Sequence, residues 1–416
     1  MHEPMKSTYR TKRDICDKFG LLERSSWPCY NSLMHAMKKK VFVAMSGGVD
    51  SSVSAALLQK EGYDITGVFM AVWQPDFLEC SRGDDRQEAM RAAAHLGIPF
   101  LTFDFEKEYK EAVVDYMIRE YTVGRTPNPD VSCNKHIKFG LFLQKALELG
   151  ADLIATGHYA RIRQLAEREF SISNSQFPNK LQIQNSKRKK LHATRYALRA
   201  GRDSAKDQSY FLWTLGQEQL RRTLFPVGDM EKSEVRNLAK KFGLPNAERK
   251  DSQGVCFLGE FDMKDFLKHY ISEKRWKVLN DAGEIVGHHA GAFYFTLGER
   301  HGFTITEKTP HDAPYYVVAK DVTANTITVS NKKIQEGVNA REVVLSDTHF
   351  VSGEFPDTSK KYSARTRYRQ PLALCSLQIK GGVASIVFDA PRELSAPGQS
   401  LVLYDGDVCL GGGIIV

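Results

Sequence analysis

A glycine-rich turn between a predicted strand and a predicted helix constrains the fold of this chain more than any other feature. Residues 41–45 are apolar and predict a buried strand, which Ser46-Gly47-Gly48 interrupts. From Ser51 onward, apolar residues recur at the spacing of one helix face. This order favours phosphate binding, because glycines let backbone N–H groups approach an anion at a helix N-terminus. An ordinary strand-to-helix turn is the alternative. A Walker A loop is excluded because no Gly-Lys-Ser/Thr follows.

Strands and helices continue to alternate up to about residue 160. Apolar periodicity predicts strands at 65–70, 100–103 and 153–156, and helices at 85–96, 109–120 and 137–149. The alternation predicts an α/β fold with a parallel sheet covered by helices. In such sheets ligands bind at the carboxyl ends of the strands, where the glycine-rich turn lies. Gly157 follows the last of these strands and would let a nucleotide approach the backbone. His158 beside it would, taken alone, more often be structural than catalytic.

The last third of the chain is predicted to form a β-barrel. Turn residues such as Pro397-Gly398 separate short β-rich runs at 315–318, 326–330, 363–368, 384–388, 400–404 and 412–416. Arg365, Arg367 and Arg369 alternate, which predicts one basic strand face. With Tyr368 beside them, they could offer phosphate contacts and a stacking ring to RNA. A solvated basic strand face is the alternative.

The composition fits a globular protein with a polyanionic partner. The net charge is +8 and the isoelectric point is about 8.9. Many proteins that do not bind nucleic acid have a similar excess of positive charge. No apolar run approaches 18 residues, so no membrane span is predicted. Residues 1–38 mix acidic and basic residues without a period, which predicts a disordered extension. A mitochondrial presequence is the alternative, and the acidic residues argue against it.

Two of the seven cysteines lie in segments whose composition suggests chemistry. The odd number of cysteines argues against a disulfide framework, and no pair has the Cys-x-x-Cys spacing of a zinc ribbon. Cys133 follows a loop fixed by two prolines, and a cation such as Lys135 or a helix N-terminus would favour its thiolate. A structural loop with an inert thiol is an equal alternative. Cys256 lies in a glycine-containing turn and, taken alone, would more often be a small buried hydrophobe.

Several motifs occur in the order seen in tRNA-specific 2-thiouridylases of the MnmA type, which the chain resembles from residue 40 to residue 416. They are SGGVDS, NPDVSCNKHIKFG, ATGHYAR, KDQSYFL, DSQGVCF, RTRYRQ, APGQS and CLGGGII. The first is similar to the PP-loop of ATP pyrophosphatases, which split ATP into AMP and pyrophosphate and adenylate a carbonyl oxygen. The resemblance implies a PP-loop catalytic domain at 39–215, a central domain at 216–316 and a C-terminal β-barrel that binds tRNA at 317–416.

The resemblance also implies roles for individual residues. Those implied to hold ATP are Ala44, Met45, Ser46, Gly47, Gly48, Val49, Asp50, Ser51, Met70 and Gly157. Those implied to contact tRNA are Asn128, Pro129, Asp130, His158, Lys206, Asp207, Gln208, Arg367, Tyr368 and Gln399. Cys133 would be the nucleophile, Cys256 the persulfide carrier and Asp130 an acid or base beside the target uridine. No residue is implied to be a metal ligand.

The implied reaction is ATP-dependent sulfur transfer to the wobble uridine of tRNA, forming 2-thiouridine. AMP transfer to the C2 oxygen would create a leaving group, and Mg²⁺ would stabilise the departing pyrophosphate. A persulfide on Cys256 would supply the sulfur by one of two routes. Cys133 would attack the persulfide and release sulfide, or the persulfide would attack the uridine directly and Cys133 would resolve the intermediate afterwards. Both routes need a persulfide-donor or relay protein and a reductant. We expect a cytoplasmic monomer, or a mitochondrial one if residues 1–38 are a presequence.

Two functions of other classes stay open at this point. A PP-loop amide ligase, such as an argininosuccinate-synthase or NAD-synthetase type, needs neither paired thiols nor an RNA-binding barrel. A non-catalytic RNA-binding protein does not need an intact SGGVDS loop. An iron–sulfur cluster on Cys133, Cys256 and a third ligand is a further alternative to persulfide chemistry.

Overall fold

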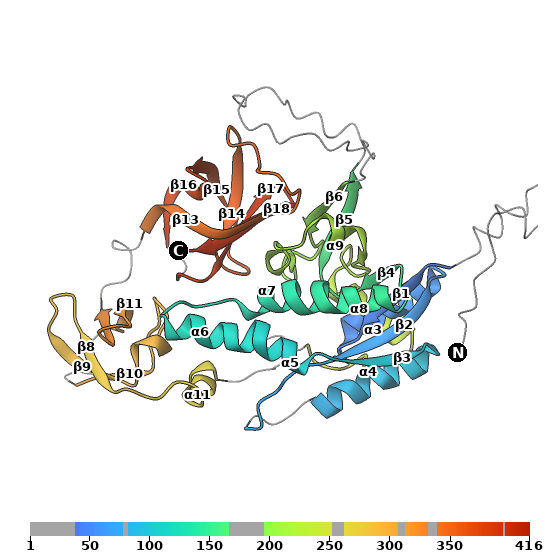
Figure 1. The fold of residues 1–416 in the computed structure, drawn as a ribbon, viewed down its shortest axis with the longest axis horizontal. Coiled ribbons are helices and arrows are strands. Elements are labelled where there is room, and N and C mark those ends of the chain that lie inside the picture. The colour runs from blue at the N-terminus through green and yellow to red at the C-terminus, as the bar shows by residue number, and fades with distance from the viewer. Residues whose placement is uncertain are drawn as a thin grey trace, which may run out of the picture. The chain divides into compact units, whose positions relative to one another are not determined.

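A parallel sheet of five strands carries the glycine-rich turn. The computed structural model describes residues 38–77, 82–165, 195–251, 262–306, 313–331, 339–393 and 396–416. The strand order is β3-β2-β1-β4-β7, and every neighbouring pair is parallel. The strands are β1 (Lys40–Ala44), β2 (Asp64–Ala71), β3 (Phe100–Asp104), β4 (Leu153–Ala155) and β7 (Thr223–Leu224). The strands predicted at 65–70, 100–103 and 153–156 are thus confirmed as β2, β3 and β4 (Figure 1).

Alternate residues of β1 pack into different apolar clusters. Val41 and Val43 join side chains of α3 (Val49–Lys60) and α4 (Arg82–Leu96). Phe42 and Ala44 join side chains of the helical segment between residues 106 and 148. Because successive side chains of a strand point to opposite faces, helices cover both faces of the sheet. That segment contains α5 (Glu106–Tyr109), η1 (Lys110–Asp115), α6 (Tyr116–Thr122), α7 (Pro129–Cys133), η2 (Asn134–Leu141) and α8 (Phe142–Glu148).

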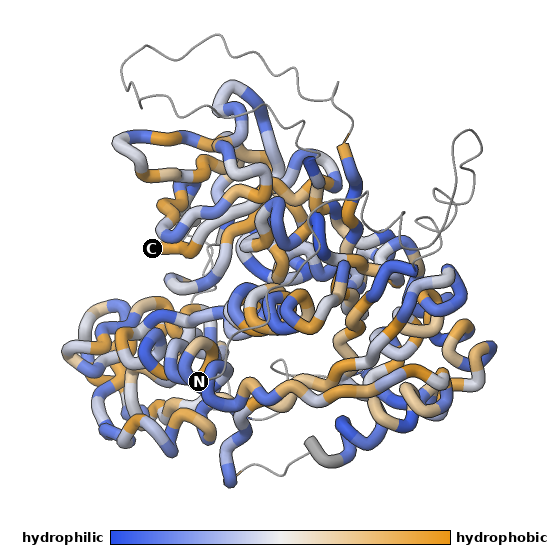
Figure 2. Tube along the Cα trace, turned by 45° about the vertical axis from the view of Figure 1, so that its right-hand side comes forward, coloured by the Kyte–Doolittle hydropathy of each residue, from blue (hydrophilic) through white to orange (hydrophobic). Residues whose placement is uncertain are grey.

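The predicted α/β fold is therefore confirmed, as are the helices expected at 85–96, 109–120 and 137–149. η1 and η2 are π-helical, and they make the helices predicted at 109–120 and 137–149 parts of longer, irregular ones. Figure 2 shows the hydrophobic residues that recur along the strands and on one side of the helices.

The chain after β4 contributes to two different sheets. Strands β5 (Ala160–Leu165) and β6 (Arg195–Ala200) form an antiparallel hairpin, and β6 pairs with β18 near the C-terminus. After the hairpin come η4 (Ser209–Phe211), α9 (Gln217–Arg221), the sheet strand β7 and α10 (Lys232–Lys241). Sequence periodicity did not reveal that this hairpin extends the barrel sheet.

A second sheet of five strands follows α11 (Met263–Lys268). Its order is β10-β9-β8-β12-β11. Its elements are β8 (Trp276–Leu279), β9 (Ile285–His289), η5 (Ala292–Tyr294), β10 (Phe303–Ile305), β11 (Tyr316–Asp321) and β12 (Thr326–Ser330). The runs at 315–318 and 326–330 were expected in the barrel, and the structure corrects this. They pair as β11 and β12, and β12 pairs with β8, so the predicted domain boundary at 316/317 separates strands of one sheet.

Six antiparallel strands at the C-terminal end close into a barrel. The order is β13-β16-β15-β14-β17-β18, and β18 pairs back to β13. The strands are β13 (Asn339–Phe350), β14 (Lys361–Arg365), β15 (Ala373–Lys380), β16 (Val383–Glu393), β17 (Ser400–Asp405) and β18 (Val408–Ile415). Side chains such as Leu377, Phe388 and Leu403 fill its interior. The barrel predicted from the last third of the sequence is confirmed.

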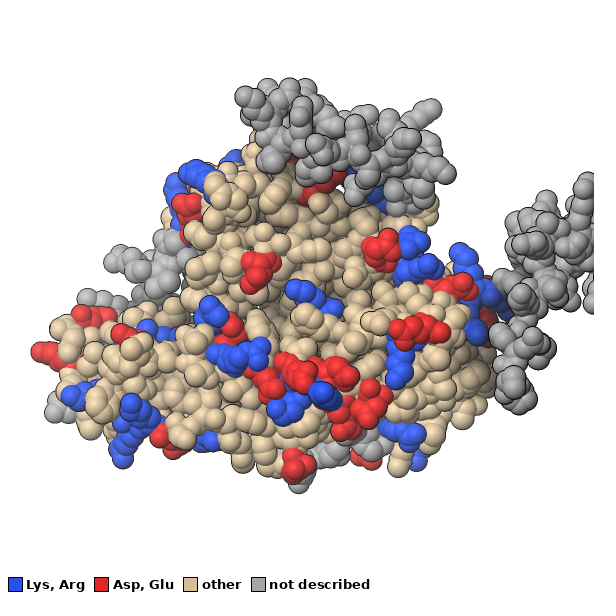
Figure 3. All heavy atoms as spheres, viewed as in Figure 1, with Lys and Arg blue, Asp and Glu red and all other residues tan. Residues whose placement is uncertain are grey.

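Residues 40–416 form one unit. Within the described residues, no helix combines the length and the apolar character needed to cross a membrane. On the face shown in Figure 3, acidic and basic side chains are interspersed, so the net positive charge does not cover that face. The extension predicted at 1–38 lies outside the described residues, apart from Lys38.

Candidate active site

The turn after β1 lies at the point where the strand order of the parallel sheet reverses. From β1 the chain passes to β2 and β3 on one side, and it returns to form β4 on the other side of β1. Gly47 and Gly48 follow β1, and Gly157 follows β4, so both turns border the same crevice. Open α/β sheets bind ligands at this position. We call residues 46–51 together with Gly157 the phosphate cradle.

Two glycines of the cradle have a backbone or packing requirement that no other residue meets. Gly47 has φ of +79°, and a Cβ on it would lie 2.4 Å from the carbonyl oxygen of Asp85. A Cβ on Gly157 would lie 2.8 Å from the backbone N of Ser51. The chain after β4 therefore passes against the first turn of α3, where N–H groups lack helical partners. The Ser51 hydroxyl donates to the Gly48 carbonyl at 3.1 Å and accepts from the backbone N of Ser46 at 3.3 Å, which fixes the turn.

Two side chains from the turn after α10 hold the cradle in place. The amide of Asn246 donates to the Gly47 carbonyl at 2.8 Å and to the Ser52 hydroxyl at 2.9 Å. Arg249 donates to the same Gly47 carbonyl at 3.2 Å and forms an ion pair with Asp85. The guanidinium thus brings a positive charge to the glycine turn. Sequence reasoning missed both residues, because nothing in the local pattern near residue 246 relates it to residue 47.

Asp50 takes part in a charged network that also contains Asp251. Lys232 Nζ lies 2.7 Å from Oδ1 of Asp50 and 2.8 Å from Oδ1 of Asp251. The Tyr159 hydroxyl donates to Oδ1 of Asp50 at 2.8 Å. Burial and the adjacent Asp50 raise the pKa of Tyr159 far above its ordinary value, so the phenol remains a donor.

Asp251 is surrounded by three cations. Lys206 Nζ lies 2.7 Å from Oδ2 of Asp251, and Arg236 Nη2 lies 2.6 Å from Oδ1. Burial alone would raise the pKa of Asp251, but the hydrogen bonds from Lys206 and Lys232 hold it well below its usual value. The network therefore contains more positive than negative charge and lies beside the cradle, which suits an anionic ligand.

The remaining residues implied to hold ATP are mostly buried. Met45 is 1% exposed and packs into the sheet core, so only its backbone could face a ligand. Ala44 and Met70 lie in one apolar cluster, which also contains Cys133. Val49 begins α3 with its side chain in the core. The structure therefore brings the predicted residues to one end of the sheet, while their contact with ATP stays a prediction.

Cys133 lies on the helix that follows the proline-containing loop. The Asn128 side chain caps this helix by accepting from the backbone N of Val131 at 3.3 Å, and Pro129 occupies its first turn. The Cys133 side chain is 0% exposed, whereas Asp130 is half-buried and Lys135 is exposed. The α-helix becomes π-helical directly after Cys133, an irregularity that is frequent at functional sites.

The loop before Cys133 is attached to the barrel. The Gln399 amide donates to the carbonyls of Thr126 at 2.8 Å and Pro127 at 3.3 Å, and Thr126 N donates to the Pro397 carbonyl at 2.8 Å. Gln399, implied to contact tRNA, thus binds the backbone that leads into the cysteine helix. Its contact with tRNA stays a prediction.

The second predicted thiol, Cys256, lies outside the described residues, so its distance from Cys133 stays a prediction. Within the described residues the cysteines are Cys133, Cys375 and Cys409, and all three are buried. Burial raises the pKa of both Cys375 and Cys409 to about 12, so these two thiols remain protonated and unreactive at neutral pH.

Three residues implied to contact tRNA have their side chains engaged within the protein. His158 is buried, its Nδ1 lies 2.7 Å from the Thr156 hydroxyl, and burial holds its pKa well below the ordinary value. Asp207 is buried and forms an ion pair with Arg365. The Gln208 side chain accepts from the backbone N of Tyr159 at 2.9 Å. Their contact with tRNA stays a prediction.

The predicted basic strand face is wrong. Strand β14 ends at Arg365, and the chain then turns, with Arg369 at φ of +61°. Arg365 is buried, while Arg367 and Arg369 are exposed. Arg367 and Arg369 do not share a strand face with Arg365, because the strand ends at Arg365. Tyr368 is half-buried, and its ring centroid lies 4.5 Å from that of Phe211.

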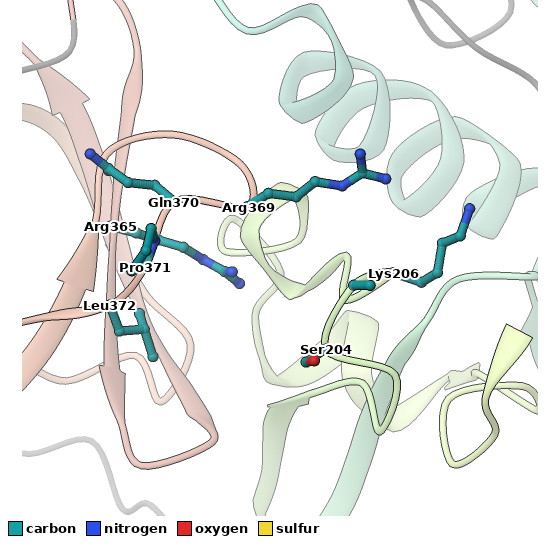
Figure 4. A pocket seen from close by; sticks show the side chains of 8 residues that line it. Ser204, Lys206, Arg365, Arg369, Gln370, Pro371 and Leu372 are labelled. Carbon is teal, nitrogen blue, oxygen red and sulfur yellow. The ribbon is translucent and has the colours of Figure 1, made fainter.

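A pocket of about 510 Å³ lies between the turn at 204–206 and the loop after β14. The side chains in Figure 4 show that Lys206, Arg365 and Arg369 bring positive charge to its lining, with Gln370, Pro371 and Leu372 from the barrel loop. Asp251 and Asp207 compensate the charges of Lys206 and Arg365, so the exposed Arg369 is the lining cation that would attract a polyanion here.

Magnesium, which the resemblance implies, would find few protein ligands here. Among the described residues, no group of three His, Cys, Asp or Glu side chains could hold a metal ion. Asp50 is engaged by Lys232 and Tyr159, and Asp85 is engaged by Arg249. Mg²⁺ at this site would therefore depend on ligands other than a cluster of three such side chains of the described residues.

The sheet order, the cradle and the barrel define an α/β nucleotide-binding protein with an appended β-barrel. Three family models match consecutive parts of the chain: a tRNA methyl transferase HUP domain at 39–260, a tRNA methyl transferase PRC-barrel domain at 264–331 and an aminomethyltransferase beta-barrel domain at 340–415. The curated relatives are more specific. The chain belongs to the family of tRNA-specific 2-thiouridylases, the MnmA proteins.

Two relatives illustrate the extent of the match. The tRNA-specific 2-thiouridylase MnmA of Streptococcus mutans is 40% identical over 381 residues, covering 91% of this chain and 95% of the relative. That of Stenotrophomonas maltophilia is 42% identical over 380 residues, covering 90% and 93%. A solved 4-thiouridine synthetase–RNA complex with bound ATP is 18% identical with a TM-score of 0.33, covering 56% of this chain and 50% of that one. This last similarity is too low to compare sites.

Proposed function

We propose that this chain uses ATP to replace the C2 oxygen of the wobble uridine in tRNA with sulfur, forming 2-thiouridine. The proposal rests on one combined observation. The Gly47–Gly157 cradle lies at the switch point of a sheet, in a chain that is 40% identical over 91% of its length to a tRNA-specific 2-thiouridylase. Such a site suits a nucleotide whose phosphates contact backbone N–H groups.

Activation of uridine would use the cradle. The C2 oxygen attacks the α-phosphorus of ATP, and pyrophosphate leaves against the N-terminus of α3 and the charges of Lys232 and Arg249. The products of this step are pyrophosphate and a uridine that carries AMP on its C2 oxygen. We expect Mg²⁺ to arrive with ATP, held mainly by phosphates and water.

Sulfur transfer would use the two predicted thiols. Cys133 attacks the persulfide on Cys256, the terminal sulfur leaves as sulfide, and sulfide displaces AMP from C2. The Cys133–Cys256 disulfide that results is reduced by an external thiol. In the second route the persulfide attacks C2 directly and Cys133 resolves the intermediate. Because Cys133 is buried, either route requires its helix or its cover to move.

The partners follow from this chemistry. A persulfide-donor protein would transfer sulfur to Cys256. We propose that the chain acts as a monomer. We propose a cytoplasmic location, because reductants there regenerate catalytic thiols. A mitochondrial location is the alternative if residues 1–38 act as a presequence. Imaging of the full-length chain and of a chain lacking residues 1–38 would distinguish the two locations.

The test is a reconstitution with purified chain, ATP, an unmodified tRNA transcript and a persulfide donor. We expect 2-thiouridine in digested tRNA by mass spectrometry, with one pyrophosphate released for each modified uridine. Pyrophosphate release that depends on an amine and a carboxylate, and not on tRNA, would favour the amide ligase. Binding of tRNA without any pyrophosphate release would favour the non-catalytic RNA-binding protein.

A further inference from the structure

Three consecutive residues, Lys206, Asp207 and Gln208, connect different parts of the molecule. The resemblance implies that each contacts tRNA, and in the structure each side chain engages another protein group. Lys206 pairs with Asp251 at 2.7 Å, Asp207 pairs with Arg365 of the barrel, and Gln208 accepts from the backbone of Tyr159 at 2.9 Å. The segment is therefore a joint between the barrel and the residues around the cradle.

Both oxygens of the Asp207 carboxylate accept hydrogen bonds from protein groups at this joint. Its side chain is 5% exposed and that of Arg365 is 9% exposed. Oδ1 accepts from the backbone N of Gly201 and of Ser209, each at 3.0 Å, and Oδ2 accepts from the Ser209 hydroxyl at 3.0 Å and from Arg365. Arg365 also donates to the Tyr404 hydroxyl at 2.8 Å. No lone pair of this buried carboxylate faces outward for a base or a sugar.

The opposite end of the joint reaches the phosphate cradle. The backbone N of Gln208 donates to the Tyr159 carbonyl at 2.9 Å, and the Tyr159 hydroxyl donates to Asp50 at 2.8 Å. Lys206 shares Asp251 with Lys232, which pairs with Asp50. Two hydrogen-bonded routes thus join the segment next to Asp207 to the first turn of α3.

We propose that Asp207 is a positioning residue, which fixes the barrel relative to the phosphate cradle through Arg365 and does not touch tRNA. The inference rests on the proposed function, in which tRNA bound by the barrel must present one uridine to ATP. Small errors of placement reduce rates strongly, because the reacting atoms must meet in a narrow geometry. Removing one partner of a buried ion pair leaves an uncompensated charge, so the barrel shifts unless both partners are present.

The test substitutes Asp207→Asn, which keeps the shape of the side chain and removes its charge. We expect kcat for 2-thiouridine formation at saturating tRNA to fall roughly 10- to 100-fold. The dissociation constant for tRNA, measured directly at several salt concentrations, should change less than about 2-fold, because no contact to tRNA is lost. Arg365→Met should show the same split, and the Asp207→Asn/Arg365→Met double variant should lose no more than the worse single variant.

Two further variants keep the test decisive. Tyr404→Phe removes one hydrogen bond of Arg365, and it should lower kcat in the same direction by a smaller factor even if Asp207→Asn does not fold. Arg367→Ala is the contrasting variant, because this exposed arginine should alter tRNA affinity and its salt dependence.

The outcomes separate this inference from the function on which it rests. A wild-type chain that forms no 2-thiouridine would overturn both. An active wild type together with an Asp207→Asn variant of normal kcat, or of roughly 10-fold weaker tRNA affinity, would overturn the inference alone. The inference would also be overturned if the kcat losses of the two single variants multiplied in the double variant. Residues that act independently contribute additively to the free energy, so their effects on a rate multiply.

Discussion

The ammonium group of Lys232 lies 2.7 Å from Oδ1 and 2.9 Å from Oδ2 of Asp50, the acidic residue of the glycine-rich turn. Lys232→Met would leave that carboxylate with Tyr159 as its neighbouring donor and remove a positive charge beside the cradle. Hydrogen bonds to charged groups contribute about 1.5–3 kcal/mol. We therefore expect ATP affinity to fall roughly 10- to 100-fold, measured by titration calorimetry and by pyrophosphate release.

Lys240→Met is the matched control for that substitution. Lys240 lies on the same helix, α10, and pairs at 3.0 Å with Glu248 at an exposed position. Exposed pairs contribute little, so ATP affinity should stay at the wild-type value. Equal losses in the two variants would show that the effect comes from the helix and not from the Lys232–Asp50 pair.

Gly157→Ala should block the cradle. The added Cβ would lie 2.8 Å from the backbone N of Ser51 and 2.9 Å from the carbonyl carbon of Asp50, and neither atom can move without distorting α3. We expect pyrophosphate release to fall by more than about 10-fold. Gly48→Ala is the comparison, because its Cβ would meet nothing closer than the Ser46 hydroxyl at 3.4 Å. Its loss should be clearly smaller, and similar losses would contradict a close approach at Gly157.

The cradle illustrates what the sequence could and could not predict. Residues 41–57 form a local strand–turn–helix unit, so periodicity and glycine chemistry located it correctly. The alternation that follows predicted the sheet in the same way. Lys232, Asn246 and Arg249 approach the turn from about 200 positions away, through contacts that only the folded chain creates.

Two errors in the barrel have a similar origin. Sequence alternation of arginines predicted a strand face, but it carries no information on where β14 ends. The runs at 315–318 and 326–330 have strand composition in either sheet, and their partner β8 decides which sheet they join. Strand composition reveals that a segment is extended and not which strand it pairs with.

The stability of the fold should depend on pH through Lys320. Burial lowers the pKa of Lys320 from 10.5 to about 8, and its Nζ donates to the Phe295 carbonyl at 2.6 Å. Between pH 8 and 10.5 the unfolded chain retains a proton that the folded chain has lost. The free energy of unfolding therefore rises with pH across this window, by at most about 3 kcal/mol.

Lys320→Met removes this contribution. Denaturant titrations at a series of pH values should show the wild type gaining stability relative to the variant from pH 8 to 10.5. The unpartnered Phe295 carbonyl adds an offset that does not depend on pH, so only the slope of the difference is informative. A difference that stays flat would contradict the lowered pKa.

Arg367→Ala should weaken binding of tRNA. Arg367 is exposed in the turn after β14, next to the half-buried Tyr368. If it makes one phosphate contact, the logarithmic salt slope of the affinity should decrease by about one unit. Filter binding at several salt concentrations measures this slope. An unchanged slope together with unchanged affinity would place this turn outside the tRNA interface.

The two predicted thiols should have separable roles. Cys256→Ser should still bind tRNA and accept no sulfur from a persulfide donor, whereas Cys133→Ser should load the persulfide on Cys256 and yield little 2-thiouridine. Serine cannot replace either thiol, because its hydroxyl is a far weaker nucleophile at neutral pH. Mass spectrometry of each variant after loading, paired with the 2-thiouridine yield, measures both steps.

Cys375→Ser and Cys409→Ser are the controls for that pair. Both thiols are buried with pKa raised to about 12, so neither supplies thiolate at neutral pH. Their substitution should lower stability by placing a hydroxyl in an apolar core, while the sulfur transferred by each folded molecule stays unchanged. Normal thiolation by Cys256→Ser would show that the persulfide is carried elsewhere. Loss of sulfur loading in Cys409→Ser, with its fold intact, would point to that thiol instead.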